Sequence, residues 1–415
     1  VVEEAYWTYP IPTEGRPSSP VESVADELRE RLEESVRLRL MSDVPLGAML
    51  SGGLDSSLIV ALMAKHVSGS LKTFSVGFQG IDVPNELDDA LAVSRLFDTE
   101  HYSLSLDGQA QIDFDDLIWQ LDEPVADLST LGFLQLSKLA REQVTVALSG
   151  QGADELFAGY RKHKAAALAG IAGTFPGTTI SALLSTPFER LKGSGGQLAK
   201  TLSAKNPASR MLAASSRITM PVRRQLLKGA MKDYMASDAA ERFGCSLLGE
   251  RNFSPLNGAL FLDAKLGLTD DMLHYFDRAS MAHSLEVRVP FLDHEFVEFS
   301  AGIPPQYKIG PRLTTKHVLK LAAKNVLPDS IVNKPKIGFF HSAIDGWIRT
   351  QLKGSVGERL RTQDRATRDI FDQKALDLMI AAQEKGHAEH SHTLLVLLML
   401  ELWLSTYLPR AMASP

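Results

Sequence analysis

The sequence has almost no cysteine: Cys245 is the one thiol among 415 residues. A single cysteine forms neither an intrachain disulfide nor a zinc cluster, so we expect a reducing, cytoplasmic compartment. No basic-then-apolar signal peptide follows Val1, and residues 9–20 have the proline-rich composition of a linker. We therefore expect residues 1–20 to be a linker tail from an N-terminal domain that is missing here.

Excess positive charge and long apolar runs are also absent. Lys and Arg number 44 against 50 Asp and Glu, and a net charge of -6 gives no general attraction to nucleic acid or to anionic lipid. Glu401 interrupts the longest apolar run, residues 394–404, whereas a membrane-spanning helix needs about 20 nearly uninterrupted apolar residues. We expect a buried core helix there, and no nucleic acid or membrane as partner.

The patterns that are present alternate between strands and helices. They predict helices at residues 21–40, 56–66, 86–97 and 131–141, and strands at 47–50, 72–78, 101–104 and 144–148. Such alternation predicts an α/β fold, with a parallel sheet covered by helices on both faces.

The later part of the chain has a different composition. Residues 161–250 are rich in Ala, Leu, Lys and Ser, and residues 256–405 have a helical pattern broken by prolines. We expect an α/β domain over 21–165, a helical insertion over 166–250, and a mostly helical part over 251–415.

The strongest motif is residues 50–57, Leu-Ser-Gly-Gly-Leu-Asp-Ser-Ser, between a predicted strand and a predicted helix. Glycines let the backbone approach an anion, serine hydroxyls add donors, and the helix offers its positive N-terminus. The spacing of the common phosphate loop, with its lysine, is absent. Asp55 would repel a bare phosphate, so the motif makes sense if Asp55 binds Mg²⁺. The alternative is a tight turn with Asp55 as the helix N-cap.

A second loop has the same construction. Residues 149–155, Ser-Gly-Gln-Gly-Ala-Asp-Glu, follow the strand that ends at Leu148. Loops at the carboxyl ends of parallel strands can face one another, so Asp55 and Asp154 could share the cations on one triphosphate. Alternatively, Asp154 and Glu155 only favour a helix N-terminus electrostatically.

Residues 50–57 resemble the pyrophosphate loop of the N-type ATP pyrophosphatases. Ordered stretches over most of the chain then resemble the asparagine synthetase family, in its C-terminal synthetase domain: residues 122–127, 147–150, 154–160, 277–281, 285–293 and 334–339. The resemblance implies an adenine nucleotide alpha-hydrolase-like fold, with ATP and Mg²⁺ as cofactors.

The resemblance also implies roles by position. The ATP-binding residues would be Leu50, Ser51, Gly52, Gly53, Asp55, Ser56, Ser57, Val76, Ser149 and Gly150. Asp55 and Asp154 match Mg²⁺ ligands, and Lys336 matches a lysine that stabilises charge developing on the α-phosphate. Lys334 is the competing candidate.

A substrate pocket is the weakest part of the resemblance. Its candidates are Asp122, Asp127, Asp277 and Arg278. Arg278 could bind a carboxylate bidentately. Glu286 and Arg288 are weaker candidates of the same kind. The alternative for this group is a structural salt-bridge network that holds the helices together.

The sequence departs from the family pattern in two ways, and both concern the amine that would attack the adenylate. The family's glutaminase domain uses an N-terminal cysteine, and residue 1 here is Val1. Gln151 occupies a position that is commonly Glu or Asp, and a neutral amide cannot deprotonate ammonia. Gln151 would then only orient the substrate.

These observations give three hypotheses. In the first, ATP converts aspartate to β-aspartyl-AMP with release of pyrophosphate, and ammonia then converts this adenylate to asparagine and AMP. The partners would be a small-molecule or peptide carboxylate and an ammonia or amine donor, which a glutaminase domain absent from this chain could supply. The second is a specialised amide or macrolactam synthetase of the same family, of the β-lactam or lasso-peptide type. The third is a non-catalytic nucleotide-binding partner. For the enzyme we expect a homodimer.

Overall fold

The structure is a computed structural model that describes most of the chain. The described residues are 2–12, 19–78, 86–106, 113–127, 129–173, 201–216, 218–235, 239–334, 348, 350–352, 354–362 and 364–413.

Five short parallel strands form one sheet, in the order β3-β2-β1-β4-β5. They are β1 (Leu46–Met49), β2 (Lys72–Phe78), β3 (Glu100–Leu106), β4 (Val146–Leu148) and β5 (Glu286–Arg288). The register pairs Ala48 with Thr73 of β2 on one side and with Leu148 of β4 on the other. The chain moves outward from β1 to β3 and then returns to β4, so the strand order reverses between β1 and β4. Open α/β sheets bind ligands at such a reversal.

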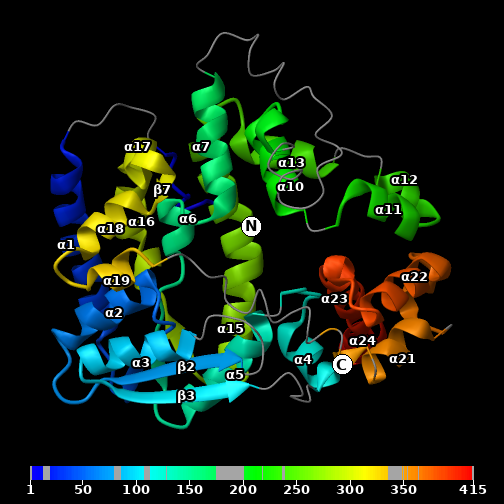
Figure 1. Cartoon of the computed structure of the whole chain (residues 1–415), viewed down its shortest axis with the longest axis horizontal. Coiled ribbons are helices and arrows are strands. Elements are labelled where there is room, and N and C mark those ends of the chain that lie inside the picture. Colours follow the sequence, from blue (N-terminus) through cyan, green and yellow to red (C-terminus); the bar gives the residue numbers. More distant parts are fainter. Residues whose placement is uncertain are drawn as a thin grey trace.

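Successive side chains of the central strands point to opposite faces of the sheet, and helices cover both faces. Ala48 and Leu50 pack with α1, α2 and α18, whereas Met49 packs with α5 and α15. The helices on the first face are α1 (Val21–Arg39), α2 (Leu54–Ala64), α3 (Glu86–Leu96), α16 (His294–Gly302) and α18 (His317–Ala323). On the second face lie α5 (Ser129–Arg141) and α15 (Leu273–Met281). The predicted α/β fold is confirmed (Figure 1).

Helix α1 shows why the sequence folds this way locally. Leu28, Leu32 and Val36 recur at helical spacing, and all three are fully buried. They pack in the same core as Val318 and Leu319 of α18, so a helix from the later part of the chain lies against the first one.

Strand β5 was missed from the sequence, which predicted helix throughout this region. Its three residues, Glu286 to Arg288, include two charged side chains and are too few to show an alternation. The strand forms because β4 offers an unpaired edge, with Val146 paired to Glu286 and Leu148 to Arg288. The parallel sheet is therefore completed by residues from outside the predicted α/β segment.

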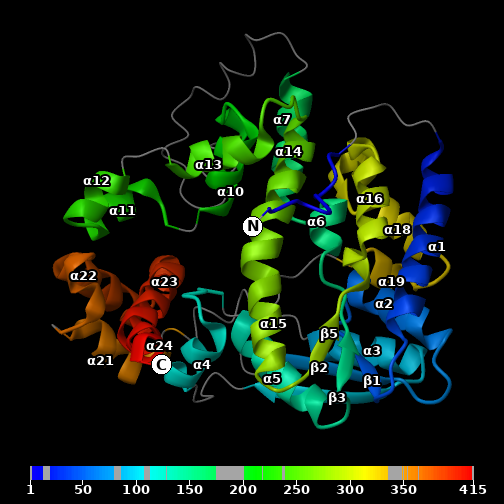
Figure 2. The same ribbon diagram turned by 180° about the vertical axis from the view of Figure 1, so that it is seen from behind.

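One long helical rod crosses the middle of the molecule. It consists of α14 (Pro255–Leu262), the π-helical stretch η2 (Asp263–Met272) and α15, as Figure 2 shows. Ser254 is the N-cap, since its hydroxyl accepts from the backbone N–H of Asn257 at 3.3 Å, and Pro255 suits the first helical position.

The remaining elements are mostly short helices on either side of this rod (Figure 1). The helices that precede the rod in the sequence are α4 (Phe114–Leu121), α6 (Ala153–Phe157), α7 (Arg161–Gly173), α10 (Pro207–Ser215), α11 (Met220–Leu226), α12 (Ala230–Met235) and α13 (Ala239–Leu248). After it come η3 (Pro290–Leu292), α17 (Pro305–Lys308), β6 (Ile309–Gly310), η4 (Pro311–Leu313), β7 (Thr314–Thr315), α19 (Asp329–Val332), α21 (Ser355–Arg361), η5 (Ala366–Asp369), α22 (Gln373–Glu384), η6 (Ala388–His390), α23 (Ser391–Leu402), η7 (Trp403–Tyr407) and α24 (Leu408–Ala413).

The apolar segment near the C-terminus is a core helix, as the sequence predicted. Residues 391–413 are long and apolar enough to cross a membrane, by length and composition alone. In the fold, Leu394 and Leu398 of α23 are buried in the main core. Buried Glu401 accepts hydrogen bonds from the backbone N–H groups of Ala366 and Thr367, both at 2.9 Å.

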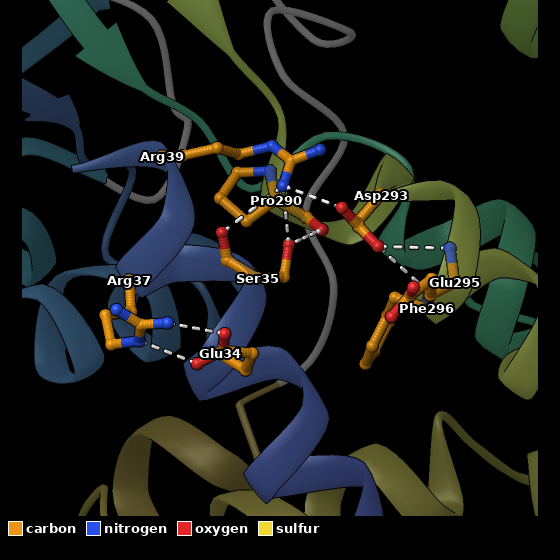
Figure 3. A network of polar contacts seen from close by, with 8 residues as sticks. All are labelled: Glu34, Ser35, Arg37, Arg39, Pro290, Asp293, Glu295 and Phe296. Atoms are coloured by element: carbon orange, nitrogen blue, oxygen red, sulfur yellow. Dashed lines mark hydrogen bonds and ion pairs between the residues drawn. The ribbon is translucent and has the colours of Figure 1, made fainter. Parts of the chain in front are cut away.

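A polar network fastens α1 to the chain that follows β5 (Figure 3). Arg39 donates to Asp293 at 3.0 Å, and Ser35 donates to the carbonyl of Pro290 at 2.7 Å. Asp293 is also the N-cap of α16, so one carboxylate closes a helix and pairs with an arginine. Arg288 donates to the carbonyl oxygens of Arg39 and Met41, both at 2.7 Å. Arg288 thus has the structural role that was the alternative to substrate binding.

We expect Glu401→Ala to lower the free energy of unfolding by about 2–4 kcal/mol, because it leaves buried N–H donors without an acceptor. Urea unfolding followed by circular dichroism measures this loss. Glu384→Ala is the matched control, since Glu384 forms a partly exposed ion pair with Arg361 at 2.5 Å. That control should cost less than about 1 kcal/mol. Equal losses in the two variants would contradict the role given to Glu401.

A second prediction concerns Lys308, which is 3% exposed and forms no ion pair with the described residues. Burial lowers its pKa to about 7. The unfolded chain therefore holds the proton more tightly than the folded one, and the free energy of unfolding rises from pH 7 towards pH 10.5. Lys308→Met should raise that free energy at pH 7 by roughly 3–4 kcal/mol, and the gain should vanish near the upper end of this range.

The control for Lys308→Met is the same substitution at Lys385, an exposed lysine at the end of α22. It should change stability by less than about 0.5 kcal/mol at either pH. If Lys308→Met does not raise the free energy of unfolding at pH 7, the buried amine does not destabilise the folded protein, and the prediction is wrong.

Candidate functional site

The two glycine-rich loops predicted from the sequence touch each other at the point where the strand order reverses. The first follows β1 and the second follows β4, its neighbour in the sheet. A Cβ atom on Gly150 would lie 2.8 Å from the backbone nitrogen of Ser56 and 2.9 Å from the carbonyl carbon of Asp55. The second loop therefore rests directly on the backbone of the first, and a residue without a side chain is needed at the contact.

The first loop is held in shape by its own hydroxyl groups. Ser56 Oγ accepts from the backbone N–H of Ser51 at 3.1 Å and lies 3.0 Å from Ser51 Oγ. Ser51 Oγ also accepts from the N–H of Gly53 at 3.3 Å. Gly52 has a φ of +70° and lies against the backbone of Asp89 in α3, where a Cβ would come within 2.6 Å. The loop is thus a fixed turn before any ligand arrives.

Helix α2 begins directly behind this turn. Its N-cap is Gly53, with an extended backbone and no side-chain cap. Asp55 lies in the first turn of the helix, so the alternative reading of Asp55 as an N-cap is wrong. The positive end of α2 faces the loop, which favours an anion there.

The second loop ends in a short helix that carries the other aspartate. Ser149 donates its N–H to the carbonyl of Arg288 at 2.9 Å, which extends the β4–β5 pairing into the loop. Gly152 has a φ of +92° and is the N-cap of α6. Asp154 follows in the first turn of α6 and is 8% exposed.

Asp55 and Asp154 converge on one buried ammonium group. Lys316 Nζ lies 2.5 Å from Asp55 Oδ2 and 2.7 Å from Asp154 Oδ1. Lys316 is 6% exposed and precedes α18 with a φ of +53°, and its N–H donates to the carbonyl of Phe157 at 3.1 Å. The two aspartates predicted to share a ligand therefore share a cation in the fold.

Electrostatics keep Lys316 charged. Burial alone would lower the pKa of its ammonium, but Asp154 and Asp55 outweigh burial and raise that pKa well above the usual value. Sequence reasoning missed this residue, because nothing in the stretch Thr-Thr-Lys marks a functional lysine. A usable signal was charge balance, since two carboxylates in a buried site require a positive partner.

The same two carboxylates fit a divalent ion. Their oxygens already point at one cation, and Mg²⁺ is commonly held by one or two carboxylates, with phosphate and water supplying its other ligands. The described residues contain no cluster of three or more His, Cys, Asp or Glu side chains able to hold a metal unaided. Any Mg²⁺ here would therefore be a shared ion that arrives with a phosphate ligand.

Next to Asp154 lies a cluster of largely buried polar side chains around Glu155 and Asp263 that sequence reasoning also missed. Burial, then the charges of Asp154 and Asp263, raise the pKa of Glu155 to about 7. Tyr160 donates its hydroxyl to Glu155 Oε1 at 2.5 Å. On the far side, Asp263 pairs with Lys162 at 2.5 Å and with His163 Nε2 at 3.0 Å.

The backbone determines the tautomer of His163. The N–H of Tyr160 donates to Nδ1 at 3.3 Å, so Nε2 carries the proton and donates to Asp263. Burial lowers the pKa of His163, which keeps the ring neutral in this pocket. Asp263 opens the π-helical stretch η2, an irregularity often found at functional sites.

The positions predicted around an adenosine are largely buried. Leu50 and Val76 are 2% and 4% exposed and pack on opposite faces of the sheet. Leu50 donates its N–H to the carbonyl of Phe74 at 2.8 Å, and its own carbonyl accepts from Ser75 Oγ. Ser57, in the first turn of α2, is fully buried.

The four candidates for a substrate pocket have different surroundings. Arg278 pairs with Asp122 at 2.5 Å, which joins α15 to the end of α4. Asp127 accepts from the N–H of Ser129 at the start of α5, at 2.8 Å, and Asp277 is exposed. The contact between Arg278 and Asp122 has the form of the structural salt bridge that was the alternative for this group.

Of the two lysines considered for the α-phosphate, the structure describes Lys334 alone. Lys336 lies outside the described residues. Lys334 forms an ion pair with Asp89 of α3, the residue whose backbone packs against Gly52 of the first loop. Gln151 follows Gly150 and is half-buried.

The contact between the loops gives a prediction. Gly150→Ala should lower the free energy of unfolding by roughly 1–3 kcal/mol, because the new methyl group meets backbone atoms that cannot rotate away. Gly302→Ala, at the end of α16 with nothing within 4 Å, should instead stabilise by about 0.5–1 kcal/mol. Thermal unfolding compares the two, and a harmless Gly150→Ala would show that the loops do not touch.

Most of the chain matches one protein family. Residues 27–405 match the family model described as asparagine synthase. The chain is 32% identical to the glutamine-hydrolyzing asparagine synthetase 1 of Bacillus subtilis, over 80% of this chain and 51% of that protein. It is 26% identical to asparagine synthetase 3 of the same organism, over 91% of this chain and 58% of that one. It is also 25% identical to amidase chyE of Penicillium rubens, over 80% and 55%.

These alignments leave part of each relative unmatched, since the chain spans about half the length of the curated relatives it matches. The matched range, residues 27–405, spans both glycine-rich loops and Lys316. The chain belongs to the asparagine synthase family.

Proposed function

We propose that this chain catalyses ATP-dependent amide synthesis, by activating a carboxylate as its adenylate and transferring the acyl group to ammonia. The observation that carries the proposal is the convergence of Asp55 and Asp154 at the reversal of strand order. Family membership supports the same reaction class. The activity of any longer protein is part of the proposal, because the match covers only 51% of the first of these relatives.

In this proposal the first loop binds the pyrophosphate of ATP. The N–H groups of residues 51–53, the hydroxyls of Ser51 and Ser56, and the positive end of α2 all supply donors to an anion. Leu50, Val76, Ser149 and Gly150 lie around the sheet reversal, where the adenosine would bind through backbone groups. Ser57, being buried, would act only through the backbone of the first turn of α2.

Asp55 and Asp154 are the residues that would hold Mg²⁺. The ion would neutralise phosphate charge and orient the leaving pyrophosphate. Lys316 adds a positive charge to the same place. Lys336 is proposed, from the family resemblance, to stabilise charge that develops on the α-phosphate.

The first chemical step joins the substrate to AMP. A carboxylate oxygen attacks the α-phosphorus of ATP, the bond from that phosphorus to the bridging oxygen breaks, and pyrophosphate departs into the first loop. Cations close to the phosphates are effective because charge grows there in the transition state. Asp122, Asp127, Asp277 and Arg278 remain the proposed residues of the substrate pocket.

In the second step, ammonia attacks the acyl carbon, the bond to AMP breaks, and the new amide loses a proton. Gln151 cannot take that proton and is proposed to orient the substrate, with pyrophosphate as the acceptor. With aspartate as the acid, the products are asparagine, AMP and pyrophosphate. A glutaminase is proposed as one source of ammonia, because the similar asparagine synthetases are named as glutamine-hydrolyzing.

A second candidate is a specialised amide or macrolactam synthetase. The observation that favours it is Gln151, which departs from the usual acidic residue at the acceptor position. Amidases among the similar proteins show that relatives of this chain are not all named for asparagine. A cytoplasmic location and a homodimer complete the proposal for either candidate, with no nucleic acid and no membrane as partner.

The test is pyrophosphate release from Mg-ATP, with aspartate and other carboxylates offered with and without ammonium. We expect aspartate to trigger release and ammonium to yield asparagine and AMP. Asp55→Asn should slow release by at least about 100-fold, because metal and phosphate lose an anchoring charge. The control, Asp369→Asn, changes a carboxylate that is 94% exposed and should leave the rate unchanged.

Each other outcome is informative. Release with a different acid but not with aspartate would replace the first candidate with the second. No release with any acid would leave a non-catalytic nucleotide-binding partner and contradict the proposed enzyme. An unchanged rate of release in Asp55→Asn would contradict the site proposed at Asp55 and Asp154.

A further inference from the structure

We propose that the ammonium of Lys316 occupies the metal position between Asp55 and Asp154 when no nucleotide is bound, and that it excludes a divalent cation until a polyphosphate displaces it. The inference rests on the proposed function only in its choice of Asp55 and Asp154 as metal ligands. It adds that the divalent cation binds only when a polyphosphate binds as well.

The geometry shows the competition directly. A single nitrogen bridges Asp55 Oδ2 and Asp154 Oδ1, at 2.5 and 2.7 Å. A Mg²⁺ ion bound by these two oxygens would lie about 2.1 Å from each and would therefore occupy nearly the same point. Two cations cannot share that point, because their repulsion in a buried site is severe.

Charge balance shows what must change. The carboxylates of Asp55 and Asp154 and the ammonium of Lys316 together carry a net charge of minus one. This is a small net charge for a buried cluster. Adding a divalent ion without removing the ammonium would reverse that balance to a net positive charge. An incoming polyphosphate supplies enough negative charge to accept both cations, so metal and nucleotide should bind together.

The surroundings of Lys316 oppose a spontaneous departure. Burial, and then the charges of Lys164 and Lys316, lower the pKa of Lys320, so Lys164 and Lys320 offer the ammonium no alternative anion. The backbone of Lys316 is pinned by its hydrogen bond to Phe157 at 3.1 Å. An ammonium that leaves the aspartates therefore needs a new anion, and a bound phosphate provides one.

Gly159 supports the same arrangement. A Cβ atom at this position would lie 1.6 Å from Asp154 Oδ1 and 2.4 Å from Lys316 Cε. Only a glycine fits at position 159, because any side chain would overlap the contact between Lys316 and Asp154. The close approach is a built feature of the fold and not a chance surface contact.

The test measures Mn²⁺ binding by the loss of the free-ion signal in electron paramagnetic resonance, with no turnover required. Wild-type protein should bind Mn²⁺ weakly alone, and at least about tenfold more tightly with α,β-methylene-ATP, an analogue that cannot release pyrophosphate. Lys316→Met keeps the length of the side chain and removes its charge. It should bind Mn²⁺ at least about tenfold more tightly than the wild type when nucleotide is absent.

Two further variants make the result specific. Lys320→Met removes a charge from the same helix without touching the aspartates, and should change Mn²⁺ affinity less than about threefold. Adding Asp55→Asn to Lys316→Met should abolish the gain. If Lys316→Met does not fold, Lys316→Gln removes the same charge and should give the same gain in Mn²⁺ affinity without nucleotide.

The outcomes separate this proposal from the proposed function. Wild-type protein that binds Mn²⁺ equally well with and without the analogue, or no better binding in a folded Lys316→Met, would overturn the role of Lys316 and leave amide synthesis untouched. No Mn²⁺ binding in any variant, even with the analogue, would overturn both, because Asp55 and Asp154 would then hold no metal.

Discussion

The bridge from Asp55 through Lys316 to Asp154 is the interaction on which the rest of the site depends. It joins the loop after β1, the loop after β4 and the start of α18, three segments that are far apart in the sequence. Two buried carboxylates at this distance would repel each other without a cation. The lysine therefore stabilises the fold. It also places a positive charge where phosphate chemistry would need one.

The sheet explains why these segments meet. Both loops leave neighbouring parallel strands at their carboxyl ends, and the strand order reverses between them. Gly52, Gly150 and Gly159 each permit an approach that a side chain would block. Arg39 and Arg288 join the end of α1 to β5 and to the segment after it, which holds this edge strand in place.

Much of the fold was readable from the sequence, because α1 has apolar residues at helical spacing and β1 and β4 are short apolar segments between predicted helices. Both loops and the meeting of Asp55 with Asp154 were also predicted, from residue types at the ends of strands. The strand β5 was missed because pairing with β4, not local preference, creates it. Lys316 and the buried Glu155 were missed because their importance comes from tertiary neighbours; Lys336 lies outside the described residues and stays a prediction.

The most direct measurement of the central claim is a crystal structure of the protein with Mn²⁺ and α,β-methylene-ATP, using the anomalous signal of manganese. The account predicts a manganese peak bound by Asp55 and Asp154, with the β- and γ-phosphates in the loop of residues 51–57. Lys316 Nζ should then contact a phosphate oxygen. A nucleotide bound elsewhere, with the lysine still bridging the two aspartates and no manganese beside them, would contradict the account.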